Sequence, residues 1–142
     1  MLIRPAEERD LDAVRRLFGL LSGSPMTPEQ MHERYEMIRR SPIDELFVCE
    51  KDGCIIGAMG FRIRECVEHV GSYGEISALI TDPDIRRAGV GRALVAFAEE
   101  HARELGCDGT WLVSGLHRKE EAHIFYQSLG FEKTGCRFVK WF

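Results

Sequence analysis

The segment from residue 79 to residue 105 constrains the fold more than any other part of the chain. An apolar strand pattern stops at Asp82-Pro83, because proline lacks the amide that a strand ladder needs. After a short turn, Gly89 and Gly91 open a stretch in which apolar side chains recur at helical spacing. A strand followed directly by a long amphipathic helix predicts a mixed α/β domain.

The rest of the chain alternates between strand and helix patterns. Apolar residues at helical spacing predict a helix over residues 11–21, capped by Asp10. Thr27 as a cap and Pro28 at the first helical position predict a second helix over residues 28–40. Lys51-Asp52-Gly53 has the form of a hairpin turn, since glycine accepts a positive φ angle. The last expected helix covers residues 119–129. The expected strands span residues 3–5, 46–50, 54–64, 73–81 and 110–113, with one or two short strands in the tail, 131–142.

Length and charge exclude several classes of protein. With 142 residues, the chain is well short of the roughly 250 to 300 at which cores divide, so we expect one domain over residues 1–142. The net charge is -4, and a protein that binds a nucleic-acid backbone needs an excess of lysine and arginine. We therefore expect no nucleic-acid partner. No stretch approaches the roughly 18 unbroken apolar residues of a membrane span, and the first residues lack the apolar run of a secretory signal. We therefore expect no membrane partner and a cytoplasmic protein.

Cysteine and histidine spacing argues against a metal site. The five cysteines are widely spaced and include no Cys-x-x-Cys pair. Three histidines, His32, His69 and His101, each stand without a ligand partner at metal spacing. We expect reduced thiols and no bound metal.

The turn before the long helix carries a phosphate-binding pattern. Residues 86–92 hold three arginines and no acidic residue. Gly89 and Gly91 would let an anion approach the backbone, where the first turn of a helix offers unpaired amides and a positive dipole end. The sequence lacks the Gly-Lys-Ser/Thr of a nucleotide P-loop, and Leu94 stands where a dinucleotide fingerprint has its third glycine. From these residues, a phosphate site and an ordinary structural turn are equally good interpretations.

A second motif lies about 40 residues further along the chain. It reads Ala122-x-x-Phe125-Tyr126-x-x-Leu129-Gly130-Phe131 and follows a predicted buried strand. Together with Arg86-x-x-Gly89-x-Gly91, it resembles the GNAT N-acetyltransferase superfamily, whose acyl-CoA site is made from these two pieces. The resemblance covers essentially the whole chain. It implies an α/β (α+β) fold of GNAT type, with a mixed, mostly antiparallel central sheet of 6–7 strands flanked by about four helices.

A narrower likeness is to the aminoalkylphosphonate N-acetyltransferases. It rests on Gly74-Glu75-Ile76, on residues 118–123 and on Arg137-Phe138. Ala78 stands where those enzymes tend to carry glutamate, and Lys119 stands where an asparagine is common.

The resemblance implies that acetyl-CoA is the co-substrate and that a primary amine attacks it directly. The backbone of residues 79–81 would pair with the pantetheine arm, and the amides of residues 86–92 would hold the pyrophosphate. The implied cofactor-binding residues are Leu79, Ile80, Thr81, Arg86, Arg87, Ala88, Gly89, Val90, Gly91, Arg92 and Phe125.

Three residues are candidates for proton transfer. Tyr126 matches the family's general acid. A phenol has an ordinary pKa of about 10, close to the value of about 8.5 for a thiol, so the Tyr126 hydroxyl can donate a proton to the departing sulfur. Glu75 is the first candidate for the base, because strand alternation would place it on the same face as Ser77, Leu79 and Thr81 if no bulge intervenes. His117 follows the short buried strand and could relay a proton near neutral pH. Solvent water is the remaining alternative.

Other interpretations stay open at this level. The favoured acceptor is a small-molecule amine, and the nearest alternative is a protein N-terminal or lysine acetyltransferase. A non-catalytic acyl-CoA-binding regulatory module is the alternative from another class. The apolar tail, residues 138–142, would pack either against its own sheet or in a homodimer interface.

Overall fold

A five-stranded sheet forms the centre of the computed structural model, which describes residues 1–85, 87–118 and 120–142. The strands lie in the order in which they occur along the chain. The first four are antiparallel to one another, and the fifth runs parallel to the fourth. They are β1 (Leu2–Pro5), β2 (Asp44–Lys51), β3 (Cys54–Glu65), β4 (Ser72–Thr81) and β5 (Gly109–Leu112).

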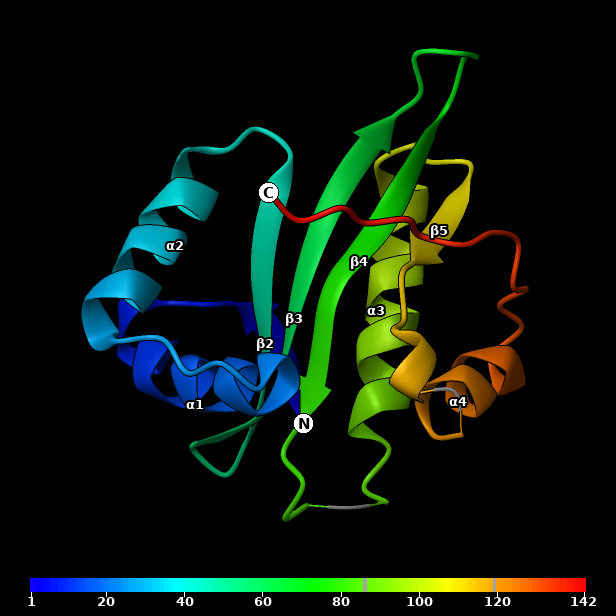
Figure 1. Cartoon of the computed structure of the whole chain (residues 1–142). Coiled ribbons are helices and arrows are strands. Elements are labelled where there is room, and N and C mark those ends of the chain that lie inside the picture. The colour runs from blue at the N-terminus through cyan, green and yellow to red at the C-terminus, as the bar shows by residue number, and fades with distance from the viewer. Residues whose placement is uncertain (86, 119) are drawn as a thin grey trace.

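Helices cover both faces of this sheet. Figure 1 shows α1 (Leu11–Ser22) and α2 (Pro28–Arg40) on one side, and α3 (Val90–Glu104) and α4 (Ala122–Ser128) on the other. Two short 3-10 helices, η1 (Glu8–Asp10) and η2 (Leu116–Arg118), complete the regular structure of the described residues. None of the described helices is long and apolar enough to cross a membrane. The expected mixed α/β architecture is confirmed.

Local sequence signals explain where α2 begins, whereas Asp10, at the N-cap position of α1, makes no side-chain capping hydrogen bond. Thr27 caps α2 through its Oγ1, which accepts a hydrogen bond from the Gln30 amide at 3.1 Å. The Gln30 side chain returns the bond by accepting from the Thr27 amide at 2.9 Å. This reciprocal box and Pro28 at the first helical position together fix the start of α2.

The alternation of side chains along the strands produces two separate cores. One core lies between the sheet and α3, and its fully buried members include Met59, Phe61 and Leu94. The other lies between the sheet and the pair α1 and α2, around Val14 and Leu17. Because both faces of the central strands are covered, β3 reads as a nearly continuous buried run from its third residue to its eighth.

The expected strands of the tail are absent from the described residues. Residues 131–142 contain no strand, so the sheet has five strands where 6–7 were expected. Phe138 is 94% exposed and Trp141 is 86% exposed, so no strand edge covers them. The physical reason is that strand propensity needs a partner edge, and β5 offers only four residues.

Packing at Gly74 makes a direct test of this fold. A Cβ at position 74 would lie 2.7 Å from Phe61 Cζ and 2.9 Å from the Ala102 methyl group, so β4 and α3 approach each other too closely for alanine. We expect Gly74→Ala to lower the free energy of unfolding by about 1–3 kcal/mol through overpacking. Gly135→Ala is the matched control, since a Cβ there meets no atom within 4 Å. Urea denaturation of both variants checks this, and equal stabilities would contradict the packing described.

Candidate active site

The fourth and fifth strands separate halfway along β4. β5 pairs with β4 from Tyr73 to Ile76, and no described strand pairs with that edge beyond this point. Residues 77–81 therefore present one row of backbone N–H and C=O groups without a strand partner. Such an edge can add an extended ligand as if it were another strand.

A bulge sits where the two strands separate. Gly60 of β3 pairs with Ala78 of β4, whereas the next residue, Phe61, pairs with Ile76. Ser77 is the extra residue, and the side-chain alternation of β4 shifts by one position across it.

The bulge places Glu75 on the opposite face from the residues beyond it. Leu79 packs into the core that contains α3, and the Thr81 methyl lies 3.7 Å from a Cβ built on Gly91 of α3. Glu75 instead faces the side of α1 and α2, opposite Arg62 in the register. The expectation that Glu75 shares a face with Leu79 and Thr81 is therefore wrong. Ile80 packs with the second core, on the same side as Glu75.

The start of α3 is an open helix end. Gly89 is its N-cap residue, in the left-handed conformation with φ of 73°, and no side chain caps the helix. The Ala93 amide donates to the Gly89 carbonyl at 2.9 Å, so the amides before Ala93 precede the first backbone bond of the helix. Arg87, Ala88 and Arg92 are exposed around this end, and Val90 is buried beneath it. Arg86 lies outside the described residues.

An ion pair holds the loop that connects β4 to α3. Asp82 is only 8% exposed; its Oδ2 accepts from Arg16 of α1 at 2.6 Å, and its Oδ1 accepts from the Asp84 amide at 3.0 Å. The Asp84 amide and then the Arg16 guanidinium lower the pKa of the Asp82 carboxyl. Sequence reasoning used Asp82 only as a strand stop and missed this anchoring role.

The second motif folds as α4 and packs on the start of α3. The Phe125 ring carbon Cζ lies 3.2 Å from a Cβ built on Gly91, so the ring packs closely against this glycine. The ring of Tyr126 lies 5.1 Å from that of Phe125 and 5.8 Å from that of Phe131. Burial raises the pKa of the Tyr126 phenol above its ordinary value.

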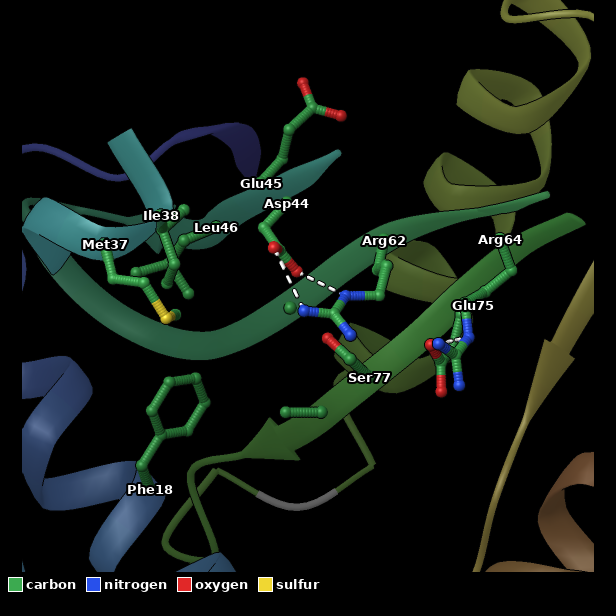
Figure 2. A pocket seen from close by; sticks show the side chains of 12 residues that line it. Phe18, Met37, Ile38, Asp44, Glu45, Leu46, Arg62, Arg64, Glu75 and Ser77 are labelled. Atoms are coloured by element: carbon green, nitrogen blue, oxygen red, sulfur yellow. Dashed lines mark hydrogen bonds and ion pairs between the residues drawn. The ribbon is translucent and has the colours of Figure 1, made fainter. Parts of the chain in front are cut away.

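A hollow of about 280 Å³ lies on the other side of β4, against α1 and α2 (Figure 2). Glu75 and Ser77 line it, next to the point where β4 leaves β5. Sequence reasoning did not identify its two arginines or the acids of β2, because nothing in the local sequence shows which charges share a wall. The lining consists of Phe18, Met37, Ile38, Asp44, Glu45, Leu46, Gly60, Arg62, Arg64, Glu75, Ser77 and Ala78.

The histidines differ in their placement. His117 is exposed on η2 and is not among the residues that line the hollow. The ring of His123 lies 3.1 Å from the Gly115 carbonyl. His101 pairs with Glu45 at 2.6 Å. The expectation that His32, His69 and His101 each stand alone is therefore wrong for His101. It is also wrong for the other two: Glu8 and Glu36 lie close to His32, and Cys66 and Glu68 lie close to His69.

A family model gives this arrangement its context. The model of the acetyltransferase (GNAT) family matches residues 11–131. The chain belongs to the GNAT family of acetyltransferases. The resemblance noted in the sequence is thereby confirmed.

Individual GNAT proteins resemble the chain over nearly its whole length. The aminoalkylphosphonate N-acetyltransferase of Salmonella typhimurium is 27% identical over 97% of this chain and 89% of its own. The glucosamine 6-phosphate N-acetyltransferase of Trypanosoma brucei brucei is 31% identical over 91% of this chain and 87% of its own. A solved aminoglycoside N-acetyltransferase in complex with CoA has a TM-score of 0.84, with 22% identity over 99% of this chain and 92% of that one.

GNAT acetyltransferases use acetyl-CoA, and the described residues fit this molecule. The exposed α3 end, with its glycine N-cap and two arginines, is suited to a diphosphate. The free edge of residues 77–81 is suited to the amide-bearing pantetheine arm. When bound, acetyl-CoA supplies an acetyl group activated as a thioester.

The open end of α3 can be tested with a pair of glycines. Gly89 and Gly106 both have left-handed backbone angles, +73° and +77°, and a Cβ at either meets no atom within 4 Å. We expect alanine at either position to cost about 1–2 kcal/mol of stability through backbone strain. Only Gly89→Ala should raise the Kd for CoA, by roughly tenfold or about 1.4 kcal/mol, since only this residue borders the open amides.

Isothermal titration calorimetry with CoA and thermal denaturation of both variants separate the two effects. Equal Kd values for Gly89→Ala and Gly106→Ala would show that the α3 end does not hold the diphosphate.

Proposed function

We propose that this enzyme transfers the acetyl group of acetyl-CoA directly to the primary amine of a small molecule. The observation that carries the proposal is the position of the free β4 edge. Residues 77–81 lie between the open end of α3 on one face of the sheet and the hollow on the other. A donor laid along this edge can therefore meet an acceptor held in the hollow.

The residues divide the proton transfers between them. The amine nitrogen forms a bond to the acetyl carbon, the carbon–sulfur bond breaks, and the Tyr126 phenol gives its proton to the departing sulfur. Glu75 takes the proton that the bound ammonium group loses before its nitrogen attacks, because it lines the hollow where the amine would sit. The second proton, which the nitrogen loses as the amide forms, replaces the one that Tyr126 gave to the sulfur. His117 lies outside that lining, which makes it the weaker candidate.

The hollow is large enough to hold a small acceptor. Its volume of about 280 Å³ is close to the lower end of small-molecule sites, about 300 Å³. The two relatives are named for small amines, an aminoalkylphosphonate and glucosamine 6-phosphate.

Three broader expectations stay predictions. They are the single domain over residues 1–142, the cytoplasmic location and the homodimer. The exposed side chains of Phe138 and Trp141 support association of the tail with a second copy, since exposed apolar surface favours contact.

Tyr126→Phe tests the proton donor. The substitution removes the hydroxyl and leaves the ring contacts with Phe125 and Phe131, so we expect kcat to fall about 100-fold or more while the Kd for CoA stays the same. Tyr73→Phe, at the far end of β4, is the control and should keep wild-type kcat. Thiol release from acetyl-CoA is followed with a panel of amines and short peptides.

The results of this panel distinguish the alternatives. Unchanged kcat in Tyr126→Phe would remove Tyr126 from the mechanism. Turnover with peptides alone would favour a protein acetyltransferase. CoA binding without turnover of any acceptor would favour a regulatory module.

The raised pKa of Tyr126 makes a prediction about pH. A general acid must be protonated to donate, and burial holds the phenol in its protonated form to a pH above its ordinary pKa of about 10. We therefore expect kcat at saturating substrate to show no Tyr126-dependent fall up to about pH 10. Profiles of kcat against pH for wild type and Tyr126→Phe check this. An alkaline fall below pH 9 that disappears in the variant would contradict it.

A further inference from the structure

We propose that the acceptor is a zwitterionic amine, and that Arg62 binds its anionic group while Glu75 binds its ammonium group. This inference rests on the proposed function, because it assigns the hollow to the acceptor. It identifies Arg62 as a specificity-determining residue of the reaction.

The carboxylate of Asp44 holds Arg62 in a fixed orientation, and both of its oxygens accept hydrogen bonds. Its Nε donates to Asp44 Oδ1 at 2.7 Å, and its Nη2 donates to Asp44 Oδ2 at 3.1 Å. The Ser41 hydroxyl donates to the same Oδ2 at 2.7 Å. The Arg62 contact and then the Ser41 contact lower the pKa of the Asp44 carboxyl, so it stays charged. Two-point pairing of this kind fixes the plane of the guanidinium.

This pairing leaves part of the Arg62 guanidinium available. A guanidinium has five N–H groups, and the two bonds to Asp44 use two of them. No other hydrogen bond of its side chain occurs among the described residues. The side chain is 35% exposed and lines the hollow, and Figure 2 shows it extending toward Ser77. An oriented guanidinium with free donors, in a hollow that a serine hydroxyl also lines, is suited to a phosphonate, phosphate or carboxylate group.

The opposite charge lies directly across the strand pair. Glu75 is the register partner of Arg62, and its carboxylate pairs with Arg64 at 3.1 Å. Arg64 is 47% exposed, and its guanidinium also lies 5.7 Å from the Trp111 ring centre. Arg64 can therefore keep its cation–π contact with Trp111 when the ammonium group of the acceptor replaces it as the ion-pair partner of Glu75.

The charge balance of this wall selects a ligand with both signs. Arg62 and Arg64 face Asp44 and Glu75, and the remaining acid, Glu45, pairs with His101. A simple cationic amine at Glu75 would add a positive charge beside two guanidinium groups. A zwitterion supplies an anion to Arg62 at the same time, so the wall stays neutral and no buried charge is left unpaired.

The test compares amines of similar size with different tails. The anionic set is 2-aminoethylphosphonate, O-phosphoethanolamine and β-alanine, which distinguish phosphonate, phosphate and carboxylate. The other set is propylamine and 1,3-diaminopropane. For wild type we expect kcat/KM to be at least tenfold higher with the best anionic amine than with propylamine, mainly through KM.

The variants are Arg62→Gln, Arg62→Lys and the control Arg103→Gln, which removes an exposed arginine paired with Glu100 on α3. We expect the preference for the anionic amine to fall toward one in Arg62→Gln, to be partly retained in Arg62→Lys and to be unchanged in Arg103→Gln. The Kd for CoA should be the same in all of them, which shows that they fold.

Several results would overturn the inference while leaving the proposed function intact. These are a wild-type preference for propylamine or the diamine, or an equal loss with both kinds of amine in Arg62→Gln. If no amine is acetylated, the proposed function fails, and calorimetry of 2-aminoethylphosphonate, O-phosphoethanolamine and β-alanine then decides the inference separately. Binding that Arg62→Gln abolishes would support it, and no binding of any of the three to wild type would refute it.

Discussion

The unpaired edge of β4 is the constraint on which the rest of the site depends. A backbone edge inside a folded domain is costly unless its polar groups find partners, and here the partnership with β5 stops at Ile76. The bulge at Ser77 coincides with that point, so the strand changes its side-chain phase where it leaves its neighbour. The result is a segment that is anchored by β3 on one side and open to a ligand on the other.

The phase change also explains why the two halves of the site lie on opposite faces of one strand. Before the bulge, Glu75 faces α1 and α2 and contributes to the charged wall of the hollow. After it, Leu79 and Thr81 face α3, whose first turn is open to solvent. A regular strand would have put the acid and these side chains together. The irregular strand separates the charged wall of the hollow from the face on which α3 begins, which are the acceptor side and the donor side in the proposed function.

Local sequence signals predicted most of the helices and strands, whereas features that depend on residues far apart in the sequence were not predicted. The capping box at Thr27, the glycine at the start of α3 and the packing of Phe125 against that start follow from residues close in sequence or from the family motif. The face of Glu75 did not follow, because a bulge is set by pairing with β3. The charged wall joins Asp44 to Arg62, 18 positions apart, and Arg64 to Glu75, 11 positions apart, and a single sequence does not reveal such pairs. The prediction of strands in residues 131–142 was wrong, because their apolar pattern carries no information about the length of sheet edge with which they could pair.

The ion pair between Arg16 and Asp82 has a mechanical consequence. Arg16 lies on α1 two residues before Phe18, which forms part of the hollow, and Asp82 begins the connection to α3. This ion pair connects α1, which lines the hollow, to the loop between β4 and α3. If the connection moves when acetyl-CoA binds at the proposed site, this ion pair would transmit the movement to α1 and to the hollow. Binding of the two ligands would then be thermodynamically coupled, and each would alter the affinity for the other by the same factor.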